Sequence, residues 1–129
     1  MTNTATANPT LRYLVSADTT VESNGKSAAF DLGSWAGQYL VLVLRVEEIL
    51  EQESLHVAIR GSADGQNWGT QAVFWFPQKF YRGVAPAALD LRQRPEIKFI
   101  QAHWEVNRWG RGIPRPYFRF AVEVQEAGR

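Results

Sequence analysis

The sequence predicts an all-β domain, built as a two-sheet antiparallel β-sandwich that is jelly-roll-like and has about eight strands. Short segments that alternate apolar and polar residues recur along the chain between turn residues, and no segment has a convincing helical period. Aromatic residues make up 12% of the chain, which favours strands over helices. A length of 129 residues suits one domain, expected at residues 11–126 after a disordered polar arm at residues 1–10.

The first strands flank a glycine turn. We expect a short strand at Leu11–Val15. The Asn24-Gly25 pair predicts a tight hairpin turn, because both residues tolerate a positive φ. A second strand at Ala28–Leu32 then leads into the loop Gly33–Gly37.

The longest predicted strand is Tyr39–Ile49. It begins apolar on both faces and ends apolar on one, which is typical of a central strand whose far end emerges toward solvent. We expect the next segment, Glu47–Ser54, to be a loop between strands. Its glutamates are interpreted as a solvated charge run; they are Glu47, Glu48, Glu51 and Glu53.

The segment from Leu55 to Trp68 alternates cleanly and then enters a polar turn. We expect Asp64 and Asn67 to cap backbone N–H groups of this turn, and Gly65 to adopt a positive φ. Trp68 is then expected to return the chain to the sandwich and cover the end of the core.

The remaining strands follow at regular spacing between Gly- and Pro-containing turns. Pro86 lies near the start of one of them, which predicts an edge position for that strand. The expected strands are Ala72–Phe76, Ala85–Leu91, Phe99–Val106 and Tyr117–Gln125.

Composition excludes several classes of protein. The chain has no cysteine, so neither a disulfide framework nor a thiolate metal site is expected. Residues 1–9 lack the basic and apolar regions of a signal peptide, and the longest apolar run, Tyr39–Leu44, is too short to span a membrane. Residues 1–64 hold four Lys/Arg against eight Asp/Glu, and residues 65–129 hold ten against five. This split fits either scatter over a solvated surface or complementary faces that help copies or partners stack.

No catalytic, metal or cofactor site is expected. His56 and His103 occupy polar positions of alternating strands and are interpreted as exposed strand histidines. A metal site that adds Glu105 to them is the weaker alternative, because the spacing matches no familiar ligand set. The chain also has no phosphate-binding glycine loop and no nucleophile elbow.

Tryptophan and arginine near predicted loops and strand ends are candidates for an interface or for ligand stacking. Nucleic-acid binding is not expected, because the net charge is only +1. Trp and Arg are enriched at protein interfaces, and an indole in a loop can also stack on a sugar ring or simply close the end of a sandwich. The candidate residues are Trp35, Trp68, Trp109, Arg108, Arg111 and Arg115.

Four segments in order carry a family resemblance: AFDLGSWAGQYLVLVLRV, LHVAIRGSADGQNW, AALDLRQRPEIKFIQAHWEV and PYFRFAVEV. Together they resemble a group of short phage and prophage proteins found among virion structural genes. The S-x-DG-x-x-W turn alone is also similar to discoidin-type sugar- or lipid-binding domains.

The phage resemblance implies a non-enzymatic structural protein, in capsid decoration, head–tail joining or the tail. Self-association or other virion proteins would be its partners, without a membrane. Its place would be the virion, or the bacterial cytoplasm when it is expressed from a prophage. The family brings no catalytic residues. The alternative is a carbohydrate-binding module that uses the loop tryptophans.

Overall fold

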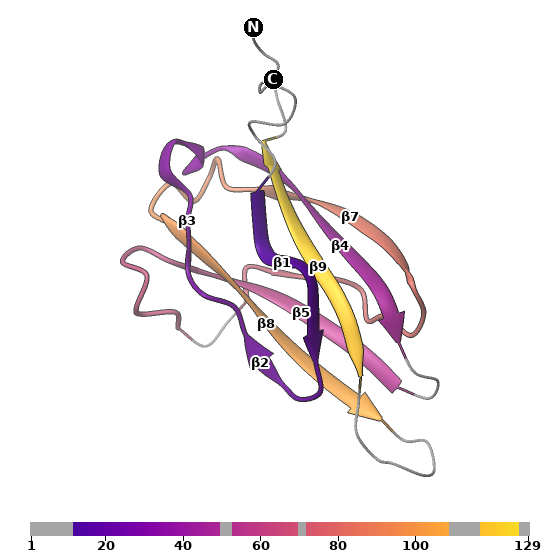
Figure 1. Ribbon diagram of the computed structural model, residues 1–129. Coiled ribbons are helices and arrows are strands. Elements are labelled where there is room, and N and C mark those ends of the chain that lie inside the picture. Colours follow the sequence, from indigo (N-terminus) through magenta and orange to yellow (C-terminus); the bar gives the residue numbers. More distant parts are fainter. Residues whose placement is uncertain (1–11, 50–52, 70–71, 109–116, 127–129) are drawn as a thin grey trace, which may run out of the picture.

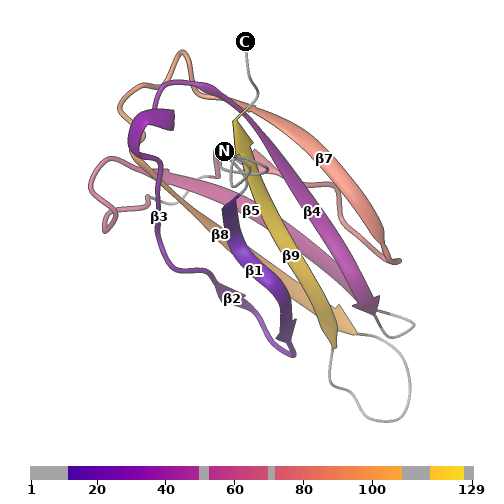
Figure 2. The same ribbon diagram turned by 45° about the horizontal axis from the view of Figure 1, so that its top comes forward.

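The computed structural model describes residues 12–49, 53–69, 72–108 and 117–126, and shows two antiparallel sheets packed face to face (Figures 1 and 2). The β4 sheet has the order β1 (Arg12–Val21), β9 (Phe118–Glu126), β4 (Tyr39–Ile49) and β7 (Gly83–Asp90). The β8 sheet has the order β2 (Gly25–Lys26), β8 (Phe99–Arg108), β5 (Glu53–Ser62) and β6 (Phe74–Trp75), and β3 (Phe30–Asp31) also pairs with β8.

The connectivity is that of a jelly roll. Both β2 and β3 pair with β8, so they act as two pieces of one interrupted strand. With these pieces counted once, the described strands number eight, and the two sheets have the orders 1-8-3-6 and 2-7-4-5. This is the order of a jelly roll, in which nearly every connection crosses from one sheet to the other. The predicted fold class is confirmed.

The core lies between the inner faces of the two sheets. From β4, Leu40, Leu42 and Leu44 are fully buried, and they alternate with residues on the outer face. Strand β5 contributes Leu55, Val57 and Ile59 from the facing sheet in the same way. The bounds predicted for the longest strand agree with β4 at both ends, although its pairing with β9 shifts register between Val46 and Glu48.

The predicted hairpin at Asn24-Gly25 is wrong. The chain crosses here from β1 in one sheet to β2 in the other, and Gly25 is not among the positive-φ glycines of the described residues. Gly25 instead pairs opposite Trp104, and a Cβ atom on it would lie 3.0 Å from Cζ2 of that indole. The glycine therefore makes room for a ring. Asn24 Oδ1 accepts a hydrogen bond of 2.8 Å from the Val106 N–H and fixes the crossing.

The segment Glu47–Ser54 is mostly strand, not loop. Strand β4 runs to Ile49 and β5 begins at Glu53. The expected solvated charge run fails most clearly at Glu53, which is only 1% exposed. Its carboxylate Oε1 accepts a hydrogen bond of 3.0 Å from the Tyr117 backbone N–H. Glu51 lies outside the described residues.

Other predictions differ in detail. Strand β1 continues to Val21, past the predicted end, with register shifts between Tyr13 and Thr19. Pro86 lies in β7 at the edge of its sheet, as predicted. In the predicted loop, Gly33–Trp35 forms a 3-10 turn.

The expected arm lies outside the described residues. Within the described part, no helix is long and apolar enough to cross a membrane.

Candidate functional site

The polar turn after β5 is held by its own side chains. The Asp64 carboxylate accepts hydrogen bonds of 2.9 Å from the backbone N–H groups of Gln66 and Asn67. Gly65 has a φ of 78°, as predicted. Asn67 acts differently from the prediction, since its side-chain amide donates to Asp64 at 2.6 Å. These donors hold the pKa of Asp64 well below its usual range, with the Asn67 and Gln66 backbone N–H groups as the largest causes.

This lowered pKa predicts a pH-dependent stability. A carboxyl group whose pKa is lower in the folded state stabilises the fold above its ordinary pKa of about 3.9, and this contribution is lost as the pH falls through the folded pKa. The Asp64→Asn variant should have a lower melting temperature than the wild type at pH 7. The difference between the two melting temperatures should narrow below about pH 4.

The control for this pH series is Asp31→Asn, which makes the same charge change where the carboxylate accepts one backbone N–H, that of Gly33. We expect Asp31→Asn to lower the melting temperature at pH 7 by less than Asp64→Asn does. Melting curves of the three proteins between pH 2 and pH 7 decide the question. An Asp64→Asn difference from the wild type that stays constant over this range would contradict the prediction.

The two candidate tryptophans that the structure describes are not exposed platforms. Trp35 is buried, and the Arg12 guanidinium lies 5.3 Å from its ring centroid. Trp68 is half-buried. Among the described residues, Trp68 belongs neither to the hydrophobic core cluster nor to the side chains packed against it, so the expectation that it covers the end of the core is wrong.

Arg108 takes part in a largely buried ion pair. It pairs directly opposite Glu53 across β5 and β8, and Arg108 Nη1 lies 3.9 Å from Glu53 Oε1. Its side chain is only 13% exposed, whereas that of Glu53 is fully buried. The other candidates of this group, Trp109, Arg111 and Arg115, lie outside the described residues.

The outer face of the β4 sheet has an apolar surface beside an open edge. In register, Val43 lies opposite Pro86, and Val41 lies opposite Ala88. Val84, one position along the same face of β7, is 53% exposed. In the described part of the chain, β7 pairs only with β4. We call this surface the β7 patch; its residues are Val41, Val43, Val84, Pro86 and Ala88.

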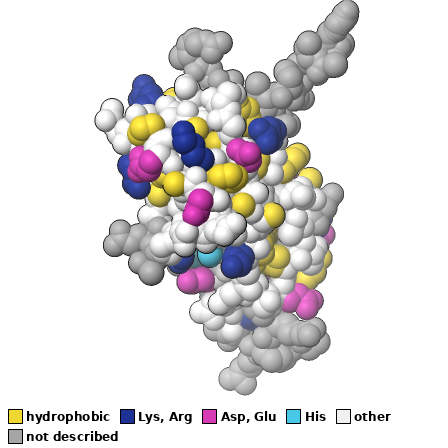
Figure 3. Space-filling view, turned by 90° about the vertical axis from the view of Figure 1, so that its left-hand side faces the viewer, with side chains coloured by type: hydrophobic (Ala, Val, Ile, Leu, Met, Phe, Trp, Pro, Cys, Tyr) yellow, Lys and Arg dark blue, Asp and Glu magenta, His cyan; other side chains and the backbone are white. Residues whose placement is uncertain are grey.

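The outer face of the β8 sheet is polar and hollowed. Figure 3 shows histidine, basic and acidic side chains gathered on the side of the molecule where β2 and β3 lie. One row crosses four strands in register: Trp75, Ala58, His103 and Lys26. A recess of about 210 Å³ opens here. We call it the Trp75 recess; the residues that define it are Asn24, Ala58, Arg60, Trp75, His103 and Glu105.

Both histidines lie on this face and are half-buried, so the expectation of exposed histidines was wrong. His56 lies against Trp75, with 4.4 Å between ring centroids. Burial is the main cause that lowers the pKa of His103, followed by the charges of Arg60 and Lys26. Across the described residues, no group of three or more His, Cys, Asp or Glu side chains is arranged to hold a metal ion.

Sequence reasoning missed the Trp75 recess as a site. Trp75 falls within the predicted strand Ala72–Phe76 and is not among the candidate residues; in the structure it lies in β6, with neighbours from β5 and β8. A signal was available in Ala58, a small residue between His56 and Arg60 on the polar face of an alternating strand.

Comparisons with known proteins show no family. No family model matches the chain, and no curated protein matches it. Among solved structures, an acetyl xylan esterase (Est2A) from the rumen bacterium Butyrivibrio proteoclasticus is similar with a TM-score of 0.37 and 10% identity. The match covers 95% of this chain and 30% of that chain.

Proposed function

We propose that this chain is a non-enzymatic structural protein that acts through protein–protein contacts. Its specific role, in this proposal, is that of a phage- or prophage-derived virion component in capsid decoration, head–tail joining or the tail. Its partners are copies of itself or other virion proteins. It is found in the virion, or in the bacterial cytoplasm when it is expressed from a prophage.

The observation that supports this proposal is the β7 patch. Val84, Pro86 and Ala88 are exposed side by side on the outer face of an edge strand. An apolar surface of this kind, next to polar surroundings, marks protein–protein contact sites. Pro86 removes a backbone donor from the strand, which disfavours simple edge-to-edge strand addition and leaves face-to-face packing as the mode of contact.

The sequence pattern and the architecture give further support. The four segments that resemble the phage proteins contain most of β4, β5, β8 and β9, which are the long central strands of both sheets. Jelly rolls are used both in viral capsids and in lectins, so the fold agrees with this role without selecting it.

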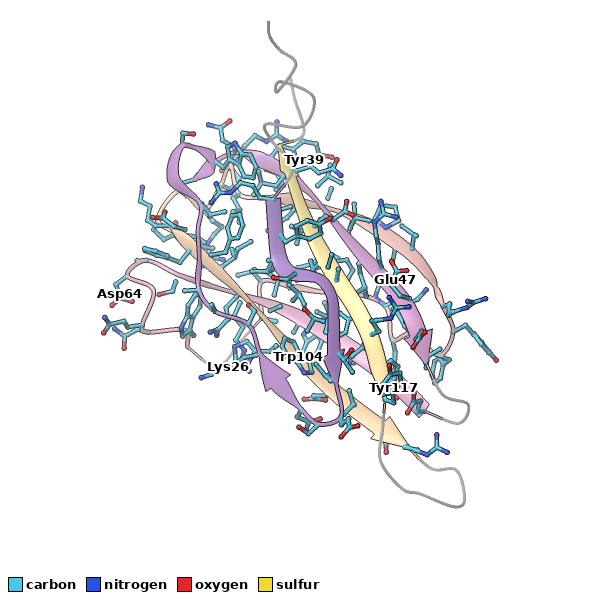
Figure 4. The ribbon with its side chains drawn as sticks, in the orientation of Figure 1. Lys26, Tyr39, Glu47, Asp64, Trp104 and Tyr117 are labelled. Carbon is cyan, nitrogen blue, oxygen red and sulfur yellow. The ribbon has the colours of Figure 1, made fainter. Side chains whose placement is uncertain are left out.

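Self-association is tested by sedimentation velocity over a range of concentrations. We expect the wild-type mass to rise with concentration, as symmetric self-association requires. Ala88→Lys places a charge within the β7 patch and should leave the protein monomeric. The matched control is Ala63→Lys, the same substitution at an exposed turn position beside Asp64, which lies away from β7 in Figure 4.

The virion role needs a second measurement. Particles purified from a bacterium that carries the gene should contain the chain at a constant ratio to the major capsid or tail protein. A strict monomer at high concentration, together with absence from such particles, would overturn the proposal.

The carbohydrate alternative does not gain from the loop tryptophans that the structure describes. Trp35 is buried beneath Arg12, and Trp68 is half-buried. Among the tryptophans that the structure describes, the exposed one is Trp75, on strand β6.

A further inference from the structure

The Trp75 recess has the form of a small ligand site. Its floor is Ala58, which is buried between Trp75 and His103 in the register of three neighbouring strands. A methyl group between two rings leaves the hollow that larger side chains would fill. At about 210 Å³ it is smaller than sites for drug-sized ligands, which measure about 300–1,000 Å³. The recess therefore has room for one ring.

One wall is an aromatic surface held in place. Trp75 is 48% exposed, and His56 packs against it with an angle of 36° between the rings. Strand β6 consists of only Phe74 and Trp75, and the Phe74 ring packs edge-on against buried Phe76 at 5.1 Å. The indole therefore presents a fixed apolar surface to solvent at an unusual place, the polar face of a sheet.

The other walls of the recess carry both hydrogen-bond donors and hydrogen-bond acceptors. Arg60 Nη1 donates to the Gly69 carbonyl at 3.1 Å, whereas Arg60 Nε is buried and has no hydrogen-bond partner among the described residues. Glu105 is exposed, and its carboxylate only accepts hydrogen bonds. The recess is therefore lined by a guanidinium group, which only donates hydrogen bonds, and by a carboxylate, which only accepts them.

The hydrogen bonds around His103 orient its ring in this wall. The Gln101 side-chain amide donates to the Ser27 carbonyl at 2.8 Å, which turns its oxygen toward His103 Nε2 at 2.7 Å. The histidine Nε2–H therefore donates to Gln101, and Nδ1 carries no proton in the neutral ring. Burial and the nearby positive charges also lower the pKa of His103 and favour this neutral form.

We propose that the Trp75 recess binds one ring of a neutral sugar, with an apolar face of the ring against the Trp75 indole. Sugar hydroxyls both donate and accept, which matches a recess lined by the Arg60 guanidinium as a donor and the Glu105 carboxylate as an acceptor. A phosphate or carboxylate ligand would meet the Glu105 carboxylate, and a purely apolar ligand would use neither polar group. The site lies on the sheet opposite the β7 patch, so it goes beyond the proposed assembly role and does not depend on it.

The test is calorimetric titration with glucose, galactose, mannose, xylose, N-acetylglucosamine and their short oligosaccharides. At least one of these sugars should bind, and Trp75→Ala should weaken its binding at least tenfold. Ala58→Leu fills the floor without removing a polar contact and should cause a similar loss, which keeps the proposal testable if Trp75→Ala does not fold. Circular dichroism and melting curves establish folding for each variant.

The matched control is Trp68→Ala, which removes a half-buried indole outside the recess and should leave the affinity unchanged. Ala88→Lys should also leave it unchanged, which separates a failure here from a failure of the assembly proposal. The proposal is overturned if no sugar of the panel binds, if binding survives both recess variants, or if Trp68→Ala abolishes it. Binding of a single-stranded oligonucleotide at Trp75 in place of a sugar would equally overturn it.

Discussion

Replacement of Trp104 by alanine is expected to lower the free energy of unfolding by about 3–5 kcal/mol, the range for removal of a large buried aromatic side chain. The indole is 8% exposed and lies edge-on to Phe120, with 5.4 Å between ring centroids. Its Nε1–H donates to the Ser23 carbonyl at 3.2 Å. Figure 4 places Trp104 in the interior, between β2 and the strands of the facing sheet.

The large effect follows from the position of Trp104 between three parts of the fold. It joins β8 to Phe120 in the other sheet, and it lies opposite Gly25, which makes room for it. Alanine would leave a cavity that β2, a strand of only two residues, is too short to close.

Urea denaturation followed by circular dichroism measures this loss without relying on tryptophan fluorescence. Trp75→Ala is the matched control, because it removes the same side chain from a position that is 48% exposed. Trp75→Ala should lower the free energy of unfolding far less than Trp104→Ala. If the two variants lose equal stability, the assignment of Trp104 to the core is contradicted.

The sequence predicted the strands and the core better than the connections between them. Alternation along β4 and β5 is a local signal, and apolar residues of that pattern such as Leu42 and Val57 are buried in the structure. The Asn24-Gly25 pair was misread because a local turn signal does not show which sheet the next strand will join. That choice depends on Trp104, which lies far along the chain and needs the space above Gly25.

The candidate site could not be found in the same way. The Trp75 recess exists because β6, β5 and β8 align in one register, and no single segment contains that information. The loop tryptophans are candidates in the sequence because an indole near glycine or proline is expected to be exposed. Trp35 shows the opposite outcome, since a neighbouring strand supplies Arg12 to cover it.

The uneven charge of the two halves of the chain is partly neutralised inside the domain. Arg45 of β4 forms an ion pair with Glu123 of β9, and Glu48 pairs with Arg119 on the same two strands at 3.1 Å. In Figure 4, Tyr117 lies near the ends of these strands, where its hydroxyl donates to Glu48 at 3.1 Å. The Glu48–Arg119 pair joins the acidic first half of the chain to the basic second half, whereas the Arg45–Glu123 pair has the opposite sense.

The buried pair between Arg108 and Glu53 should be the second most sensitive point of the fold. Arg108→Met preserves the length of the side chain and removes the positive charge that lies 3.9 Å from the fully buried Glu53 carboxylate. Breaking such a pair from one side costs about 3–5 kcal/mol, and the 3.9 Å separation with 13% exposure of Arg108 places the expected loss near the lower end of that range.

The double variant separates the ion pair from simple packing. In Glu53→Gln/Arg108→Met, the amide oxygen can still accept the Tyr117 backbone N–H, but no charge remains to be buried. Removing both charges of a buried pair is far less costly than removing one, so the double variant should be more stable than Arg108→Met alone. Denaturation at pH 7 measures the difference, and a double variant that is no more stable would contradict the ion-pair argument.

Arg94→Met is the control that tests whether burial of the ion pair or the distance between its atoms sets the stability lost when the arginine charge is removed. Arg94 Nε lies 2.6 Å from Glu96 Oε2, much closer than the atoms of the buried pair, but both side chains are 56% exposed. Exposed pairs contribute little because water already solvates both charges, so no measurable loss is expected there. Equal losses in the two methionine variants would show that burial of Glu53 does not set the cost. An interface role for Arg108 instead predicts a fold of unchanged stability with weaker self-association, and sedimentation of Arg108→Met distinguishes this outcome from destabilisation.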